Sequence, residues 1–241
     1  MAQTDARDYE ADQLIARVTE LRADPVRGNF DAAHLKEIHR RIFQDFPEYA
    51  PGEFRPDAPS HEKARELDGA PVRYTVPYPR ATEVALRLAQ ALPGRQLVDE
   101  FKSLDRAAFG TRMAKLYGDL DTAHGFVEGN SRTLRELTRQ LAAEAGHKLE
   151  WESVTDSKNG RDMLYLARDR ELFMRQFPGC ERSDFEPADR TQHEAQNIVA
   201  KAGRAYPLLE KVVDMAYRGR IPPEKSIEPG AAIEREPDLG R

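Results

Sequence analysis

The sequence predicts a mainly α-helical protein, and three observations support this fold class. Apolar residues recur every three or four positions in several long segments, as in Leu134, Leu137 and Leu141, which is typical of helices with one buried face. Proline and glycine residues divide these segments into units of helical length. Residues 72–78 instead alternate and are rich in β-branched and aromatic side chains, which predicts one arm of a small β-hairpin.

Length and composition narrow the class further. The 241 residues suffice for one core with an appendage, and a charged fraction of 33% indicates a solvated surface. The net charge of −5 argues against a general nucleic-acid-binding protein, and no apolar run is long enough to span a membrane. Cys180 is the only cysteine, so no internal disulfide is expected. We expect a cytoplasmic bacterial protein, with secretion into a host cell as the alternative.

Helical spacing places the elements in order. The first helix, 9–24, is expected to bury Leu14, Ile15, Val18 and Leu21. Asp31 is a suitable N-cap for the second, 32–46, in which His34 and His39 are interpreted as packing or surface residues. Later helices are expected at 80–92, at 96–122 with an interruption near Gly110, at 131–146 up to Gly146, at 161–176 after a turn at 157–160, and at 190–202 and 205–218.

These elements suggest four parts. Residues 1–30 form an N-terminal helix, 31–180 the core domain, 181–220 a helical extension and 221–241 a mobile tail. The last part has several prolines, few large apolar residues and no periodicity, which is why no packed structure is expected there.

The helix at 131–146 begins with the features of an anion-binding site. Asn130 or Ser131 is expected to be its N-cap, and Gly129 would allow the backbone to approach a ligand closely. The unpaired N–H groups of a first helical turn attract anions. Arg132 and Arg135 lie three residues apart, so both can reach one polyanion.

The loop before this helix adds two groups suited to catalysis. Glu128 carries a carboxylate, the kind of ligand that holds a magnesium ion bound to phosphates. His124 is a candidate general base. A base, a metal ligand and an anion site within twelve residues predict transfer of a nucleotide phosphate group.

This stretch resembles the signature of Fic-domain proteins, His-Pro-Phe-x-(Asp/Glu)-Gly-Asn-Gly-Arg-x-x-Arg. The matching residues are His124, Phe126, Glu128, Gly129, Asn130, Arg132 and Arg135. The resemblance implies a helical bundle with a β-hairpin flap over the site, and a protein adenylyltransferase that moves AMP from ATP to a Ser, Thr or Tyr hydroxyl. It implies that His124 deprotonates that hydroxyl, that Glu128 holds Mg²⁺, and that the phosphates are bound by Gly129, Asn130, Ser131, Arg132 and Arg135.

Two signature positions differ. Gly125 replaces the proline and Ser131 replaces the second glycine. Doc toxins, a related branch, have lysine at the position of Ser131 and act as protein kinases. Because serine is neutral and Arg135 is present, we favour AMP transfer, and keep a Doc-like kinase and a non-catalytic scaffold as alternatives.

Two further elements extend the resemblance. Residues 52–55, Gly-Glu-Phe-Arg, are similar to a segment that follows an early helix in the family, and Arg55 is interpreted as a buried hydrogen-bonded link to a helix end. The flap is placed within 65–79, where Val72, Tyr74 and Val76 would pair with a target segment by strand addition. His61, Lys63 and Arg65 are interpreted as part of a solvated charged loop.

The sequence also lacks a family element. Many Fic proteins carry an inhibitory helix with the pattern (Ser/Thr)-x-x-x-Glu-(Gly/Asn), which this chain does not contain. The resemblance therefore implies a toxin that a small antitoxin inhibits in trans, with a glutamate that pairs with Arg135. In related toxins the targets are ATPase subunits of gyrase and topoisomerase IV, and we expect neither direct nucleic-acid nor membrane binding.

Overall fold

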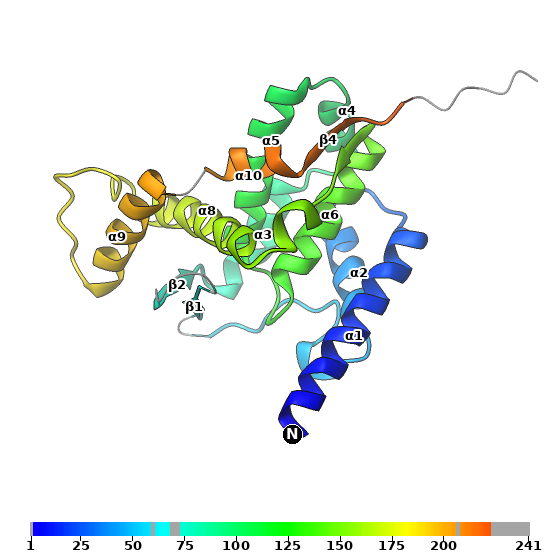
Figure 1. Ribbon diagram of the computed structural model, residues 1–241, viewed down its shortest axis with the longest axis horizontal. Coiled ribbons are helices and arrows are strands. Elements are labelled where there is room, and N and C mark those ends of the chain that lie inside the picture. The colour runs from blue at the N-terminus through cyan, green and yellow to red at the C-terminus, as the bar shows by residue number, and fades with distance from the viewer. Residues whose placement is uncertain (1, 59–60, 68–72, 206–207, 223–241) are drawn as a thin grey trace, which may run out of the picture.

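The structure is a computed structural model, and it describes residues 2–58, 61–67, 73–205 and 208–222, without the side chains of 2–7 and 201–205. The fold is mainly helical, as predicted (Figure 1). The α-helices are α1 (Ala2–Ala23), α2 (Ala32–Phe43), α3 (Ala81–Ala91), α4 (Gln96–Lys102), α5 (Arg106–Ala123), α6 (Asn130–Glu144), α7 (Glu152–Thr155), α8 (Lys158–Gln176), α9 (Arg190–Ala205) and α10 (Leu209–Ala216). The strands are β1 (His61–Glu66), β2 (Arg73–Tyr78), β3 (His147–Leu149) and β4 (Tyr217–Arg220).

Helices α5 and α6 form the centre of the main core, joined by the loop at 124–129. Leu134, Leu137 and Leu141 of α6 are buried, as their spacing predicts. Each fully buried leucine stabilises the fold by about 1.5–3 kcal/mol relative to an exposed one. Gly146 follows the end of α6 with φ of 78°, a backbone conformation that suits glycine at the end of a helix. Helices α2 and α4 pack against α6, and α3 and α10 pack against α5.

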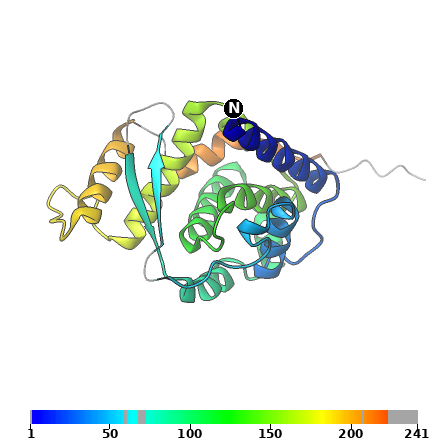
Figure 2. The same ribbon diagram turned by 90° about the horizontal axis from the view of Figure 1, so that it is seen from below.

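The N-terminal helix and the hairpin lie at opposite ends of the molecule. Both views place α1 at one end and the β1–β2 hairpin with α9 at the other (Figures 1 and 2). Helix α1 packs on α2 through Leu14 and Leu21, which are buried. Ile15, predicted to share this face, is 65% exposed. The prediction for Ile15 was wrong because α2 covers only part of the apolar stripe.

A second hydrophobic cluster lies under the hairpin. It contains Tyr74, Val76 and Tyr78 of β2 together with Leu166, Leu172 and Phe173 of α8 and Ala195, Ile198 and Val199 of α9. The segment at 61–66, interpreted as a solvated loop, is strand β1 and pairs antiparallel with β2, with Lys63 opposite Val76. That interpretation was wrong because every second residue of β1 is partly buried, and two of them, Lys63 and Arg65, pair with Glu128 and Asp169.

The C-terminal segment is divided between the two cores. Helix α9 packs on α8 in the second cluster, whereas α10 packs on α5 in the main core. The second of the two predicted helices, 205–218, ends at Ala216, where the chain continues as β4 and pairs with β3. The predicted extension at 181–220 therefore contributes residues to both clusters. The predicted tail at 221–241 lies outside the described residues except for its first two.

Two predicted breaks are placed differently. The turn expected at 157–160 is the start of α8, because the Ser157 hydroxyl accepts a hydrogen bond from the N–H of Gly160. The interruption in 96–122 lies at 103–105 rather than at Gly110. Asp105 caps α5 there by accepting a hydrogen bond from the N–H of Ala108.

Gly110 is thus an interior helical residue, and replacing it with alanine should stabilise the protein. A Cβ at this position would lie 3.9 Å from the Glu210 Cγ, an ordinary contact. We expect Gly110→Ala to raise the free energy of unfolding by about 0.5–1 kcal/mol, because alanine loses less backbone entropy on folding. Denaturant unfolding measures this change.

Gly118→Ala in the same helix is the matched control. Its Cβ would lie 2.5 Å from the Arg175 Nη1, so this guanidinium must move. We expect no gain, or a loss, at Gly118. A lower free energy of unfolding for Gly110→Ala would contradict a continuous helix through residue 110.

Candidate functional site

The loop between α5 and α6 is bounded by two residues with left-handed backbone. His124, the C-cap of α5, has φ of 45°, and Gly129, the N-cap of α6, has φ of 79°. A Cβ at Gly129 would lie 2.1 Å from the Phe43 Cζ, so both the conformation and the space require glycine. The expectation that Asn130 or Ser131 caps α6 was wrong, because Gly129 occupies the cap position without a side-chain bond.

Asn130 instead holds the loop closed. Its Oδ1 accepts from the N–H of Phe126 at 3.0 Å, and its Nδ2 donates to the Phe126 carbonyl at 2.7 Å. The Asn130 side chain is buried. The side-chain amide of Asn130 is therefore used within the loop. Its backbone N–H, at the start of α6, remains able to bind an anion.

His39 of α2 supports the same loop, which the sequence did not reveal. Its ring stacks on Phe126, with centroids 3.8 Å apart. Its Nδ1 accepts from the N–H of Gly52, which places the proton on Nε2, and Nε2 donates to the Glu128 carbonyl at 3.1 Å. Burial lowers the pKa of His39 to about 4, so the ring is neutral near pH 7. His39 was interpreted as a packing or surface residue. It is a packing residue, and the residue on which it packs, Phe126, belongs to the motif loop.

Arg55 links the loop to the rest of the fold, as predicted. Its Nε donates to the carbonyl of His124, the residue that ends α5, and its other guanidinium end donates to the Pro79 carbonyl. Its backbone N–H donates to the carbonyl oxygen of Gly125 at 2.8 Å. The guanidinium is buried, so these bonds are worth more than exposed ones.

His124 lies under the hairpin. The Tyr78 ring stacks on it with centroids 3.6 Å apart, and the His61 ring lies 5.4 Å away. Its side chain is buried, and within the described part of the chain neither ring nitrogen has a hydrogen-bond partner. Burial, and then the positive charges of Arg168 and Lys63, hold the pKa of His124 well below its usual range. The imidazole is therefore neutral and able to accept a proton.

A buried ionic cluster next to His124 joins the hairpin to α8. Arg65 donates to both carboxylate oxygens of Asp169 and to the Tyr78 hydroxyl, and Tyr74 donates to Asp169 at 2.9 Å. Arg168 lies 3.5 Å from Asp121 of α5. No motif or spacing in the sequence predicted this cluster, because its members come from three distant segments. Arg65, predicted to be solvated, is a partly buried member of this cluster.

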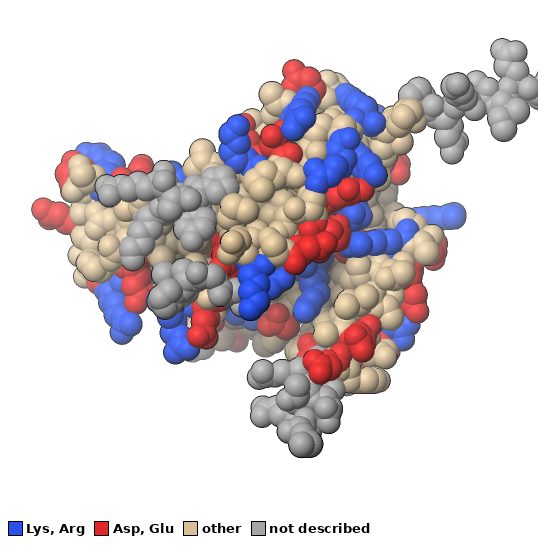
Figure 3. Space-filling view, in the orientation of Figure 1, with Lys and Arg blue, Asp and Glu red and all other residues tan. Residues whose placement is uncertain are grey.

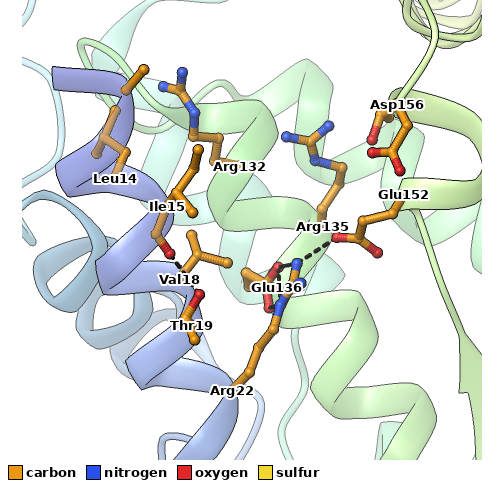
Figure 4. A pocket seen from close by; sticks show the side chains of 12 residues that line it. Leu14, Ile15, Val18, Thr19, Arg22, Arg132, Arg135, Glu136, Glu152 and Asp156 are labelled. Carbon is orange, nitrogen blue, oxygen red and sulfur yellow. Dashed lines mark hydrogen bonds and ion pairs between the residues drawn. The ribbon is translucent and has the colours of Figure 1, made fainter. Parts of the chain in front are cut away.

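Arg132 and Arg135 line a cavity of about 390 Å³ between α1, α6 and α7 (Figure 4). In the described part of the chain neither guanidinium makes a hydrogen bond or an ion pair, although Glu152 and Asp156 line the same cavity. The cavity is therefore a place where two positive charges and the first turn of α6 can meet an anion. Arg22 and Arg139, by contrast, are both paired with Glu136 and Glu152.

Glu128 could hold a metal ion carried by phosphates. The positive charge of Lys63 and the N–H of Gly129 outweigh partial burial and lower the pKa of Glu128, so this carboxylate is ionised. Among the described residues no three His, Cys, Asp or Glu side chains gather into a metal site. One carboxylate next to an anion site suits Mg²⁺, which keeps several waters and takes its other ligands from phosphates.

The sequence model of the Fic/DOC family matches residues 29–142. Residues 29–142 form a Fic/DOC domain. Two curated relatives agree. The protein adenylyltransferase VbhT of Bartonella schoenbuchensis is 33% identical over 141 residues, which are 57% of this chain and 26% of VbhT. A protein adenylyltransferase of Bartonella henselae is 29% identical over 164 residues, 63% of this chain and 28% of the relative. The chain thus spans about a quarter of the length of these relatives.

Solved structures show the same fold. The N-terminal Fic domain of a VirB-translocated Bep effector protein from Bartonella quintana, with bound ADP, superposes with a TM-score of 0.57 at 20% identity, covering 90% of this chain and 86% of that one. The BepC protein of Bartonella tribocorum, with bound AMPPNP, gives 0.54 at 20% identity, covering 81% and 86%. No described helix is long and apolar enough to cross a membrane.

The two outer edges of the hairpin in this Fic/DOC domain are not equally open. Val72 lies outside the described residues, and the side chains of Tyr74 and Val76 are buried in the second cluster. On the outer edge of β2, the N–H of Thr75 donates to Glu194 and the carbonyl of Pro77 accepts from Gln176. The docking role predicted for β2 stays a prediction, although two outward backbone groups of β2 are already paired within the chain.

The buried His39 predicts that acid destabilises this domain. A pKa lowered from 6.5 to about 4 means that the fold favours the neutral ring, so stability is fully present above pH 6.5 and is lost as the pH falls toward 4. We expect His39 to account for at most about 3 kcal/mol of that loss. His39→Gln should flatten the dependence of unfolding free energy on pH in this window.

Other buried histidines also titrate, so His34→Gln is the control. Burial lowers the pKa of His34 too, but its ring contacts Phe30 and Gln140 rather than the motif loop. A two-dimensional NMR spectrum should show the loop amides of 125–129 shifting on acidification in the His34 variant and not in the His39 variant. Equal slopes and equal shifts in all three proteins would contradict the assignment.

Proposed function

We propose that this chain is a protein adenylyltransferase that moves AMP from ATP to a Ser, Thr or Tyr hydroxyl of a target protein. The observation that carries the proposal is one loop with a neutral, buried His124 at its start and the unpaired Arg132 and Arg135 just beyond its end. The curated relatives that bear the name protein adenylyltransferase support it.

The proposed chemistry assigns the proton to His124. A ring nitrogen of His124 accepts the hydroxyl proton while the hydroxyl oxygen attacks the α-phosphorus of ATP. The bond from that phosphorus to the bridging oxygen breaks, and pyrophosphate leaves with the bonding electron pair. The low pKa of His124 keeps the base unprotonated at neutral pH, at the cost of lower basicity.

The phosphates are assigned to the start of α6. The N–H groups of Asn130, Ser131 and Arg132 lie in the first turn of that helix, where no intrahelical acceptor exists. Arg132 and Arg135 would stabilise the charge of the leaving pyrophosphate. Glu128 would hold Mg²⁺, which neutralises phosphate charge when bound. Gly129 would contribute through its backbone, since the Phe43 ring fills the space where a side chain would start.

The target is proposed to add a strand to β1. The N–H and carbonyl groups of Glu62, Ala64 and Glu66 face away from β2, because their neighbours in β1 form the ladder. Within the described chain these groups have no recorded hydrogen-bond partner. A target segment paired with this edge would run past His124. The acidic Glu62 and Glu66 favour basic residues opposite them.

A small antitoxin is proposed as the regulator. The cavity beside Arg135 is lined on one side by the apolar Leu14, Ile15 and Val18 of α1, so the glutamate side chain of a partner helix could enter it. No described carboxylate pairs with Arg135, which supports inhibition by another protein. By family resemblance, gyrase and topoisomerase IV subunits are the first targets to test.

Label transfer tests the reaction. With Mg²⁺ and a bacterial lysate, we expect protein label from ATP labelled at the α-phosphate and none from the γ-phosphate. His124→Ala should lower the transfer rate at least about a hundredfold, since general-base catalysis contributes about 10² to 10⁴, while ATP binding stays within a few-fold. Label from the γ-phosphate only would show that Ser131 supports kinase chemistry, and no label from either would favour a scaffold.

Growth tests the toxin proposal. Expression of the wild-type chain in bacteria should arrest growth, and expression of His124→Ala should not, because the variant lacks the base. A soluble His34→Gln variant, altered away from the loop, should still arrest growth and serves as the control. Harmless expression of a soluble wild-type chain would contradict a toxin that needs a separate inhibitor.

A further inference from the structure

Lys63 bridges the flap and the motif loop. It lies in the middle of β1, and its Nζ donates to the Glu128 Oε2 at 2.8 Å and to the Val127 carbonyl at 3.1 Å. The two ends of this ion pair are 65 residues apart in the sequence and partly buried. Lys148 makes an equally short pair with Glu150, but these residues are two positions apart and Lys148 is more exposed than Lys63. The Lys63 contact is therefore set by the tertiary fold.

This contact uses the carboxylate that was assigned to the metal. One oxygen of Glu128 accepts from the Gly129 N–H, and the other accepts from Lys63. Magnesium binds carboxylate oxygens at about 2.0–2.1 Å, which would place it close to the ammonium. Two cations beside one carboxylate repel each other, so Lys63 competes with a metal ion for Glu128.

The same contact holds the flap over the base. Two residues of the hairpin, His61 and Tyr78, cover the His124 ring, and they are paired across the strands. Farther along β1, Arg65 is tied to Asp169 of α8. Lys63 lies between these points. Among the described residues of the hairpin, it is the one that makes a polar contact with the loop. Without it, the start of β1 would be held to the loop only by ring packing.

We propose that Lys63 is a resident counter-cation of Glu128 and a latch on the flap. Loading of Mg²⁺ and nucleotide displaces the ammonium from Glu128, the start of β1 loosens, and the acceptor hydroxyl gains access to His124. The nucleotide therefore binds before the target. The role of Glu128 in this inference rests on the proposed function, whereas the latch itself rests on the Lys63 contacts.

Lys63→Met removes the charge and keeps the length of the side chain, and Lys148→Met is the matched control. The first measurement is calorimetric titration of Mg²⁺ into the full chain with the non-hydrolysable analogue AMPPNP. Partly exposed ion pairs cost about two- to fivefold in an equilibrium constant when broken, so Lys63→Met should need two- to fivefold less Mg²⁺ for half-saturation. Lys148→Met should match the wild type.

The second measurement is hydrogen exchange of the amides in 61–66 without any ligand. Exchange should be faster in Lys63→Met than in the wild type, and unchanged in Lys148→Met and in the charge-preserving Lys63→Arg. Addition of Mg²⁺ and AMPPNP should speed exchange in the wild type toward the rate of Lys63→Met.

The outcomes separate the two proposals. If the wild type binds no nucleotide, the proposed function is wrong, and the exchange rates without ligand still decide whether Lys63 is a latch. If Lys63→Met needs more Mg²⁺ for half-saturation, Lys63 helps to bind the nucleotide in the loaded site. The counter-cation proposal would then be wrong. Equal exchange in Lys63→Met and wild type, or slower exchange of the wild type on loading, would overturn the latch.

Discussion

The site depends on the pair of hydrogen bonds between the Asn130 side chain and the backbone of Phe126. These bonds close the loop that starts α6, and both of its ends have left-handed backbone. A non-glycine residue in that conformation, here His124, persists where the surroundings hold it. Arg55 provides this support from one side and His39 from the other. The loop is therefore rigid before any ligand arrives, which is what a phosphate site needs.

Charge is distributed around this loop in two layers. Below the hairpin, the partly buried Arg65 and the buried Arg168 both lie close to the buried Asp169, which neutralises them in part. After burial itself, the positive charges of Arg168 and Arg65 help to lower the pKa of His124. Toward solvent, Arg132 and Arg135 have no ion-pair partner among the residues that the structure describes. On the surrounding face, basic and acidic side chains are interspersed (Figure 3). A polyanion is thus attracted to the start of α6 by local groups rather than by a charged surface.

The comparison of sequence and structure separates local from long-range information. The buried face of α6, its end at Gly146 and the helix-end link of Arg55 follow from spacing, glycine chemistry and family resemblance, and the structure confirms them. The errors concern residues whose partners are distant. Asn130 looked like a cap because the Phe126 backbone it binds is close only when the loop is folded. The segment at 61–66 was interpreted as solvated because the partners of its charges, Glu128 and Asp169, are distant in the sequence.

By itself, the sequence determined the mainly helical fold class, the motif loop and the chemical groups that it carries, since all of these depend on residues within a few positions of one another. Only the tertiary structure decided which strand edge of the flap is open, that the two clusters share the C-terminal segment, and that Lys63 binds Glu128. These features depend on pairs of residues 65 or more positions apart, whose contact energies do not appear in local spacing. From sequence alone, a charged residue is interpreted as solvated when its ion-pair partner is far away in the chain.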